Sequence, residues 1–416
     1  MAKMKDSGVE WCEKIPSHWK VKHNKYLMRK HKLLCPKYDG EDILSLTMKG
    51  VIIRDLDAGG KMPASFNGYQ KVYPGNLLMC LFDYDVTPRC IGLVEKTGLC
   101  SPAYSQFVMK DNNSSKYYYY YYLMLDNTKE LLHLAKNLRH SFTEEQLGEI
   151  LTPVPPVPEQ NKIADFLDKK CTEIDSLSED IQKEIDLLEE YKKSVITEAV
   201  TKGLNPNVEL KDSGVEYIGT YPSLWTLKKL KYTFKERNER SLTGSELLLS
   251  VSQYKGVIPS SENSMRTMQP NSLIGYKKVY KDDLVFNKLN PTLARFGKSE
   301  YEGITSPEFS IYIIDSNQLY PKFLEYILRT EKYSKEYGRI TLGVGDGYTR
   351  LYTNQLGNVY VAVPSLVEQE QILLFLKSII DEIDKTLSEK KEQLTTLAEY
   401  KKSLIYEYVT GKKEVI

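Results

Sequence analysis

The chain has 416 residues, of which 57 are lysine or arginine and 56 are aspartate or glutamate, and 41% of its residues are hydrophobic. This composition indicates a soluble globular protein of two or three domains. No apolar run approaches the ~20 residues that a membrane span needs, and the first residues lack the apolar core of a signal peptide. We therefore expect neither export nor membrane insertion, and we expect a cytoplasmic protein.

Residues 1–20 form the first predicted element, a short constant segment that returns later in the chain. Its motif Asp-Ser-Gly-Val-Glu-Trp at residues 6–11 recurs as Asp-Ser-Gly-Val-Glu-Tyr at residues 212–217, an offset of 206. At the same offset, Ile-Pro-Ser-His-Trp returns as Tyr-Pro-Ser-Leu-Trp. A constant offset indicates an internal repeat. Residues 206–226 are accordingly predicted to be a linker that starts the second copy.

Residues 21–153 and 227–362 are the variable middles of the two copies. Short β-rich runs are broken by Gly, Pro and Asn turns, as at residues 43–46 and 309–314, which predicts two α+β domains rather than βαβ arrays. All six cysteines and all five histidines lie in the first half of the chain, without a C-x-x-C pair. Buried or incidental thiols are therefore expected, and neither a disulfide framework nor a metal site is indicated.

A run of six tyrosines at residues 117–122 offers two interpretations. It resembles an aromatic platform on which nucleic-acid bases could stack. However, the repeat aligns the run with residues 322–327, which have the pattern of an amphipathic helix. Packing in the protein core is the favoured interpretation.

Residues 154–205 and 363–416 are the constant ends of the two copies, and both are predicted to be long helices. Apolar residues fall at heptad spacing in each, with charged residues between them. The predicted core positions of the first helix include Ile174, Leu177 and Ile181. Because the two helices match residue by residue, we expect them to pair as an antiparallel intramolecular coiled coil. Residues 1–20 should then lie beside the end of the second helix, which makes the chain nearly circular.

Charge separates along the same divisions. Residues 159–203 contain 7 basic and 12 acidic residues, and residues 368–413 contain 8 and 9. The rest of the chain has 42 basic and 35 acidic residues. This excess of about seven positive charges is a mild indication that the middle domains bind a polyanion.

The usual signals of catalysis are incomplete. The sequence Gly297-Lys298-Ser299 lacks the glycine that a phosphate-binding loop needs five residues upstream, where Thr292 stands. The segment that starts Asn290-Pro291 resembles only weakly the motif with which amino-methyltransferases hold their target amine, because it lacks the second proline and the aromatic residue of that motif. The second half contains no histidine. We expect no catalytic residues, no bound cofactor and no metal in this chain.

The two constant segments together resemble a known family. The Asp-Ser-Gly-Val-Glu segment, the Pro-x-x-x-Glu-Gln opening of each long helix and the Glu-Tyr-Lys-Lys-Ser near its end are similar to the specificity subunits of type I restriction-modification enzymes. The resemblance covers essentially the whole chain, and the ordered set of motifs occurs twice.

The resemblance implies two target recognition domains separated by two conserved helices, each domain reading half of a split, asymmetric sequence of double-stranded DNA. It also implies two modification subunits, which carry S-adenosylmethionine and methylate adenine, and motor-nuclease restriction subunits. A rigid helix pair would act as a ruler for half-sites about one helical turn apart. The alternatives are a stand-alone DNA methyltransferase, a coiled-coil scaffold without a nucleic-acid role, and the specificity subunit of a type IIB enzyme.

The repeat also sorts the candidate DNA contacts into two classes. Positive residues shared by the two middles are candidates for phosphate contacts, because they cannot distinguish two different half-sites. These are Lys49 with Lys255, and Arg89 with Arg295. Base contacts are expected where the middles differ. The candidates are Arg54, Lys61, Asn67, Arg139 and His140 in the first middle, and Arg266, Gln269, Asn290, Tyr348 and Arg350 in the second.

Overall fold

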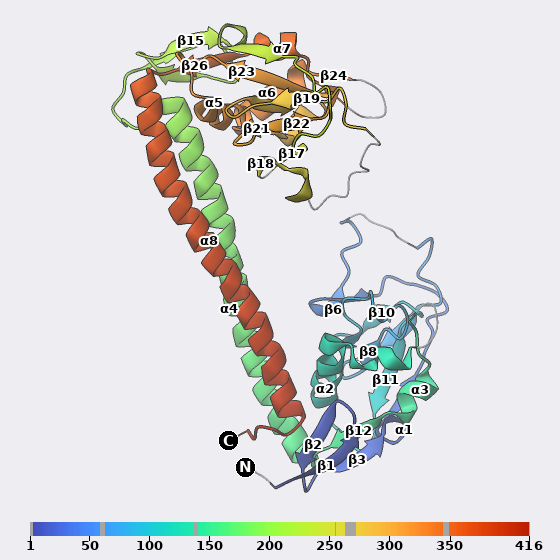
Figure 1. Cartoon of the computed structure of the whole chain (residues 1–416). Coiled ribbons are helices and arrows are strands. Elements are labelled where there is room, and N and C mark those ends of the chain that lie inside the picture. The colour runs from blue at the N-terminus through green and yellow to red at the C-terminus, as the bar shows by residue number, and fades with distance from the viewer. Residues whose placement is uncertain are drawn as a thin grey trace. The chain divides into compact units, whose positions relative to one another are not determined.

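The computed structural model describes residues 3–58, 63–135, 140–253, 255–262, 272–343 and 349–415. It divides into two compact units. Unit 1 contains Met1–Gln182 with Lys391–Ile416, and unit 2 contains Lys183–Lys390. The division falls inside both long helices, so each unit consists of one α+β domain and a segment of each helix (Figure 1). The predicted α+β class is confirmed.

Unit 1 opens with a hairpin and continues into two four-stranded sheets, of order β6-β5-β10-β7 and β4-β11-β8-β9. Its strands are β1 (Met4–Val9), β2 (Cys12–Pro16), β3 (Lys20–His23), β4 (Met28–His31), β5 (Ile43–Thr47), β6 (Gly50–Ile53), β7 (Gln70–Val72), β8 (Leu77–Met79), β9 (Ile91–Leu93), β10 (Gly98–Cys100), β11 (Ser105–Met109) and β12 (Leu151–Val154). Its short helices are α1 (Asn24–Leu27), α2 (Ser115–Thr128), η1 (Glu130–Leu134) and α3 (Glu144–Glu149).

Unit 2 repeats this plan, and its sheet of order β16-β23-β20-β21 corresponds to β4-β11-β8-β9 of unit 1. Its strands are β13 (Leu210–Asp212), β14 (Thr220–Pro222), β15 (Thr226–Lys229), β16 (Phe234–Arg237), β17 (Leu249–Ser252), β18 (Gly256–Pro259), β19 (Lys277–Val279), β20 (Leu284–Asn287), β21 (Phe296–Lys298), β22 (Gly303–Thr305), β23 (Phe309–Ile314), β24 (Leu342–Gly343), β25 (Thr349–Arg350) and β26 (Tyr360–Val363). Its short helices are η2 (Leu230–Tyr232), η3 (Ser260–Glu262), η4 (Pro291–Leu293), α5 (Pro321–Leu328), α6 (Glu331–Ile340) and α7 (Thr353–Gly357).

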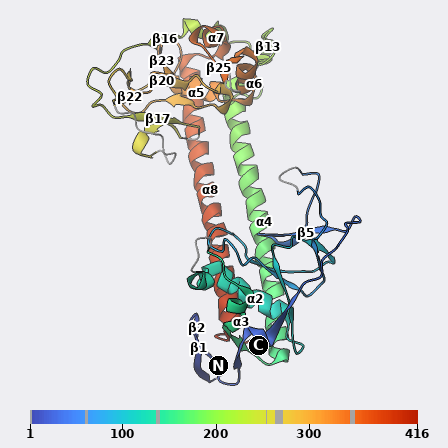
Figure 2. The ribbon, with the colours of Figure 1, turned by 90° about the vertical axis from the view of Figure 1, so that its right-hand side faces the viewer.

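The two long helices are α4 (Val157–Lys202) and α8 (Leu366–Val409), and they lie side by side in both units (Figures 1 and 2). In unit 1, Lys401 Nζ of α8 is 2.6 Å from Asp175 Oδ1 of α4. In unit 2, Lys192 Nζ of α4 is 2.6 Å from Asp384 Oδ1 of α8. These two ion pairs exchange under the repeat offset of 209, and in each unit the two helix segments run antiparallel. The predicted antiparallel pair is confirmed.

The apolar seam of the helix pair departs from the heptad prediction at Leu177 and at Tyr191, a further predicted core position of α4 that is 52% exposed. Ile174 and Ile181 of α4 are buried as predicted, but Leu177 is 50% exposed and Ile185 is buried instead. A straight helix with 3.6 residues per turn drifts relative to a strict seven-residue repeat. The heptad positions at which each long helix faces the other helix therefore change along the seam.

Each long helix begins with the Glu-Gln pair of the repeat, and both side chains anchor neighbouring segments. In unit 1, Glu159 Oε1 accepts a 3.0 Å hydrogen bond from the buried Trp19 indole. Gln160 Nε2 donates to Pro155 O at 2.9 Å, and Gln160 Oε1 accepts from Ser114 N at 2.8 Å. Unit 2 makes the corresponding three bonds, in which Glu368 and Gln369 bind Trp225, Pro364 and Tyr320. The motif therefore fixes the helix start to its domain.

The far end of each long helix packs on the tryptophan that binds the start of the other helix. Gly411 follows α8 with φ +70°, and a Cβ built there would lie 2.5 Å from Pro16 Cδ and 2.9 Å from Trp19. Gly203 follows α4 with φ +77°, and its Cβ would lie 3.4 Å from Trp225. Only glycine reaches this conformation without strain. The N-terminal segment thus lies against the end of the second helix, as the repeat predicted.

The tyrosines of α2 are packed in the core of unit 1. Tyr117, Tyr118 and Tyr121 are fully buried, and Tyr120 and Tyr122 nearly so. The predicted packing role is confirmed. The predicted alignment with residues 322–327 is wrong by one residue, because Tyr117 meets Trp19 edge-on as Phe323 meets Trp225. The correct counterpart is residues 323–328.

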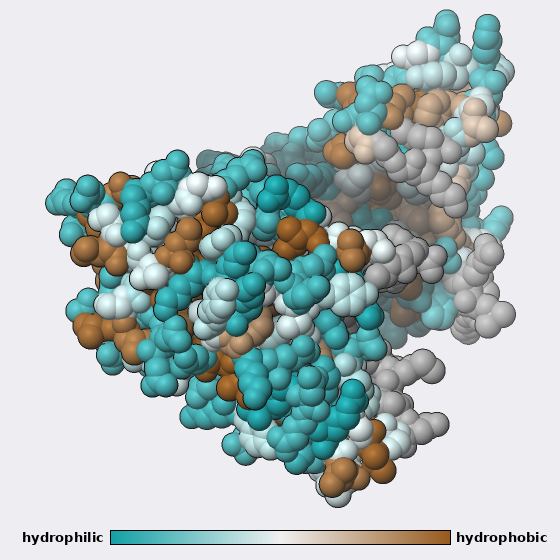
Figure 3. Space-filling model, turned by 90° about the horizontal axis from the view of Figure 1, so that it is seen from above, coloured by the Kyte–Doolittle hydropathy of each residue, from teal (hydrophilic) through white to brown (hydrophobic). Residues whose placement is uncertain are grey.

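All six cysteines are buried, as expected. Among the described residues, no helix is long and apolar enough to cross a membrane, and no cluster of histidine, cysteine and acidic residues could hold a metal ion. Figure 3 shows a face of the molecule on which hydrophilic residues predominate and hydrophobic residues are scattered.

Candidate nucleic-acid interface

Lys49 and Lys255 lie at the tips of equivalent hairpins. β5 and β6 form the hairpin of unit 1, and β17 and β18 form that of unit 2. Each lysine is exposed and stands directly before a glycine with positive φ, Gly50 or Gly256. The backbone N–H of Lys49 donates to Thr47 Oγ1 at 3.1 Å, and that of Lys255 donates to Ser252 Oγ at 3.3 Å. Both ammonium groups therefore project from a fixed turn.

The pairing of Arg89 with Arg295 is wrong by one residue. Cys80 N donates to Cys90 O in unit 1, and Asn287 N donates to Arg295 O in unit 2. These bonds continue β8–β9 and β20–β21, so the counterpart of Arg295 is Cys90. The side chain of Arg89 is only 16% exposed, and its Nε is 4.0 Å from Asp126 Oδ2. This favours a structural role for Arg89, whereas the half-buried Arg295 remains a candidate phosphate contact.

Asn290 and Arg350 are brought together in unit 2. Asn290 has φ +48° and donates its backbone N–H to Thr349 O at 2.9 Å, while its Oδ1 accepts from Thr349 N at 3.1 Å. Leu289 and Arg350 form a β-bridge. Arg350 Nη2 is 2.7 Å from Glu308 Oε2, and the arginine side chain is 27% exposed. To contact a base, the guanidinium of Arg350 would have to leave Glu308 and bind the base edge instead.

The structure does not bring the described unit 1 candidates together. Exposed Asn67 accepts a 2.8 Å bond from Tyr38 N, and Arg54 follows β6 with its backbone bonded to Ile43 O. His140 has φ +42°, and its Nδ1 is 2.8 Å from Asp85 Oδ2. The remaining candidates lie outside the described residues. They are Lys61, Arg139, Arg266, Gln269 and Tyr348.

A buried lysine beside the Asn290 loop escaped the sequence prediction. The side chain of Lys277 is 5% exposed, and its Nζ donates to Phe309 O at 2.9 Å. Burial lowers the pKa of Lys277, and the nearby charges of Lys288 and Arg240 lower it further. Positive charge therefore gathers here, as expected where an anionic backbone binds.

The repeat explains how unit 2 tolerates this lysine. In unit 1 the same position is Gln70, whose Nε2 donates to Tyr104 O at 2.7 Å, the counterpart of Phe309 O. A second equivalent position also differs between the units: it is Lys30 in β4 of unit 1 and Glu236 in β16 of unit 2. In unit 1, Lys30 of β4 pairs with Glu144, whereas in unit 2 Glu236 of β16 is 3.7 Å from Lys277. The internal comparison, a signal available once strand register is known, identifies Lys277 and Glu236 as a relocated ion pair.

We expect Lys277→Gln to destabilise unit 2 by about 1–3 kcal/mol, because Glu236 loses its cation in a partly buried position. Adding Glu236→Gln should recover much of the loss, because it removes the uncompensated charge. The measurement is a double-mutant cycle of the free energy of unfolding in urea. Strict additivity of the two substitutions would contradict the ion pair.

The comparisons with known proteins agree on one family. A family model for the type I restriction modification DNA specificity domain matches residues 95–187. Two proteins of Methanocaldococcus jannaschii are similar. The type I restriction enzyme MjaVIII specificity subunit is 24% identical over 64% of this chain and 63% of its own length. The putative type I restriction enzyme MjaX specificity subunit is 25% identical over 66% and 62%.

Solved structures share the fold over nearly the whole chain. One comes from work on complex assembly and conformational transition of the type I R-M system. It has a TM-score of 0.68 at 13% identity, and the match covers 96% of this chain and 99% of that one. The HsdS subunit from Thermoanaerobacter tengcongensis has a TM-score of 0.53 at 12% identity, with 96% and 98% covered.

Residues 95–187 therefore match the type I specificity domain, and the chain is similar to type I specificity subunits over 64–66% of its length. The family model covers all of α2 and α4 as far as residue 187, and α4 holds the Glu-Gln anchor. The sequence matches to both curated specificity subunits span a little under two thirds of their lengths.

Proposed function

We propose that this chain is a type I specificity subunit, which recognises a bipartite, asymmetric sequence in double-stranded DNA and directs modification and restriction subunits to it. Each unit reads one half of the target. The chain itself is non-catalytic and holds no cofactor. Methyl transfer to adenine takes place on two modification subunits, which bring S-adenosylmethionine.

One observation carries this proposal: two units share a frame but differ in the side chains that their loops present. The strand pairings and helix anchors correspond from unit to unit, as do Lys49 and Lys255 at the hairpin tips. By contrast, the two neighbouring segments that hold Asn290 and Arg350 in unit 2 correspond to residues 80–90 and 140–141 in unit 1. These segments carry different side chains in the two units. A common frame with different polar loops suits the reading of two different half-sites.

The test is to co-express the chain with the modification subunits of its own system and to sequence the methylated adenines of the host DNA. The proposal expects one motif with two unlike halves separated by a spacer of fixed length. A single continuous motif, or methylation by the chain alone, would contradict it.

We expect Lys49→Ala to weaken binding to all DNA sequences and to lower the salt dependence of log Kd by about one, because a phosphate contact releases counterions. Arg350→Ala should instead cost about 1–3 kcal/mol at one position of the half-site and relax its specificity. The measurement is binding of the assembled complexes to cognate and single-substituted duplexes at several salt concentrations. Loss of discrimination with Lys49→Ala and uniform weakening with Arg350→Ala would reverse the two assignments.

A further inference from the structure

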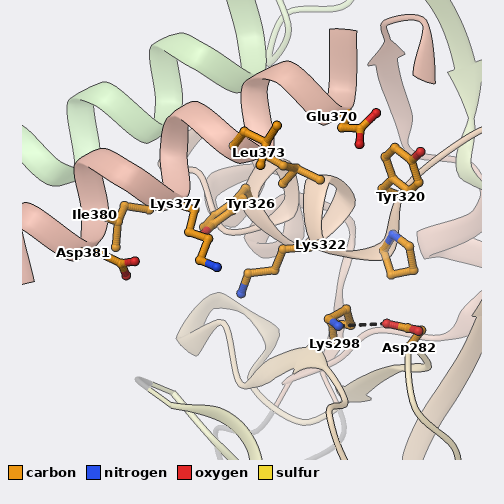
Figure 4. A pocket seen from close by; sticks show the side chains of 12 residues that line it. Asp282, Lys298, Tyr320, Lys322, Tyr326, Glu370, Leu373, Lys377, Ile380 and Asp381 are labelled. Atoms are coloured by element: carbon orange, nitrogen blue, oxygen red, sulfur yellow. Dashed lines mark hydrogen bonds and ion pairs between the residues drawn. The ribbon is translucent and has the colours of Figure 1, made fainter. Parts of the chain in front are cut away.

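Unit 2 contains a groove of about 510 Å³ between α5, α8, the strand β21 and the turn that precedes β20. Three lysines line it: Lys298 from β21, Lys322 from α5 and Lys377 from α8. The ammonium ends of Lys322 and Lys377 point into the same hollow, beside the ring of Tyr326 (Figure 4). The groove is therefore a place where positive charge converges next to a phenolic hydroxyl.

Unit 1 has an equivalent lysine and tyrosine, but there a carboxylate of the chain itself accepts hydrogen bonds from both. Lys116 and Tyr120 of α2 are the counterparts of Lys322 and Tyr326 at the repeat offset of 206. Both donate to Asp168 of α4, and the Tyr120 hydroxyl lies 2.8 Å from Asp168 Oδ1. The counterpart of Asp168 at the helix offset of 209 is Lys377. Unit 2 thus retains both donors and replaces their acceptor with a third cation.

The charges around the groove are not equally compensated. Lys298 is 2.8 Å from both Asp282 and Glu300, and Lys322 is 3.0 Å from Glu325. Lys377 is exposed and makes no hydrogen bond or ion pair with the described residues. Glu370 and Asp381 also line the groove from α8. Lys377 therefore offers an uncompensated positive charge to an anion that enters the groove.

Tyr326 is suited to donate to such an anion. Burial, with the neighbouring charges of Glu325, Asp381 and Asp384, raises the pKa of Tyr326 to about 12. The hydroxyl therefore keeps its proton at neutral pH, as the Tyr120 hydroxyl does where it donates to Asp168.

The rest of the groove is apolar, which selects the kind of anion. Leu373, Leu374, Ile380 and Pro321 line it, and Leu374 is 64% exposed. A free phosphate or a nucleic-acid backbone would leave this apolar wall in water. A polypeptide that carries an acidic side chain beside apolar ones would cover the wall and meet the lysines together.

We propose that this groove binds an acidic, apolar-flanked segment of a partner protein, and that the partner's carboxylate contacts Lys322, Lys377 and Tyr326 as Asp168 contacts Lys116 and Tyr120. The inference rests on the proposed function in one respect, that the chain assembles with modification subunits. Because Asp168 closes the equivalent position in unit 1, the contact is available in unit 2 alone. Two identical partners would therefore bind the two units unequally.

The decisive variant is Lys377→Asp, which gives unit 2 the internal carboxylate that unit 1 already has. The variant should fold, because the same Lys-Tyr-Asp arrangement is present in unit 1. Lys377→Gln removes the charge without supplying an acceptor. Lys385→Asp makes the same charge change about two turns further along α8, where the side chain is 78% exposed, and serves as the control.

The measurement is titration of the full chain and its variants with the purified modification subunit of the same system, followed by sedimentation velocity. We expect Lys377→Asp to weaken the tighter binding step about tenfold or more, Lys377→Gln to weaken it less, and Lys385→Asp to leave it unchanged. Parallel titrations use inorganic phosphate and a DNA duplex as probes.

The outcomes separate the two hypotheses. If the wild-type chain does not bind the modification subunit, the assembly part of the proposed function fails, and this inference fails with it. If the wild-type chain binds and Lys377→Asp binds equally well, only the groove assignment is overturned. If Lys377→Asp loses affinity for phosphate or the duplex while subunit binding is unchanged, the groove is a phosphate site and the inference is also overturned.

Discussion

Replacing Trp225 with alanine is expected to destabilise unit 2 by about 3–5 kcal/mol, the usual cost of deleting a large buried aromatic side chain. Trp225 is 2% exposed and meets the ring of Phe323 edge-on at 6.3 Å. Its indole N–H donates to Glu368 at the start of α8, and its ring packs against Gly203 after the end of α4. One side chain therefore joins the start of one helix to the end of the other.

Trp19→Ala should have a similar effect on unit 1, where Trp19 makes the corresponding contacts with Glu159, Tyr117 and Gly411. The measurement is hydrogen exchange by mass spectrometry in increasing urea, which reports each unit separately. Leu224→Ala is the matched control, because Leu224 adjoins Trp225 in sequence and is 88% exposed. Equal protection of unit 2 in Trp225→Ala and Leu224→Ala would contradict the joining role.

A rise in pH is expected to unfold unit 1 before unit 2, because all six cysteines belong to unit 1 and are buried there. Burial raises the pKa of Cys12 and of Cys171 from 9.0 to about 11, and that of Cys100 to about 12. The buried Tyr118 of α2 likewise has a raised pKa because of its burial. Each unit of pKa difference corresponds to about 1.4 kcal/mol.

The direction follows from proton linkage. Above pH 9 the unfolded chain loses its thiol protons while the folded chain keeps them, so the unfolded state becomes more favourable. The stabilisation is complete below pH 9 and is lost as the pH rises through about 11–12. In unit 2 the corresponding groups are tyrosines, such as Tyr312, whose pKa burial raises from 10.0 to about 12.

Circular dichroism and tyrosinate absorbance, recorded together with hydrogen exchange, would follow the two transitions. Cys171→Ala removes one of the titrating groups and should move the unit 1 transition to higher pH. Tyrosinate absorbance that rises to its full extent while unit 1 stays folded would contradict this prediction, as would earlier unfolding of unit 2.

The long helices could be predicted from sequence because their signals are periodic and occur twice. Apolar spacing predicts the buried seam, and the residue-by-residue match predicts that the two helices pair in antiparallel orientation. The drift from Leu177 to Ile185 was missed, because a heptad template does not include the local winding of a straight helix.

The alignments of α2 and of Arg89 were wrong by one residue for a common reason. Loops of unequal length change the offset within the domains: Leu77 of β8 corresponds to Leu284 of β20, an offset of 207, whereas Leu93 of β9 corresponds to Lys298 of β21, an offset of 205. Strand register and the tryptophan contacts determine the true correspondence, and neither can be read from identities alone. Contact residues in loops have no periodicity at all, so their roles stay predictions.

The ion pairs of the helix seam have a consequence for the origin of the chain. Asp175 and Lys192 belong to one repeat, and each is bound by the counterpart of the other in the second repeat. A single repeat thus encodes both sides of its own interface, as an isologous homodimer requires. On the proposed function, two copies of such a half-length ancestor would read a palindrome. Fusion of the copies would free the two proposed DNA-reading surfaces from identity, so that each could change its target while the shared seam is preserved.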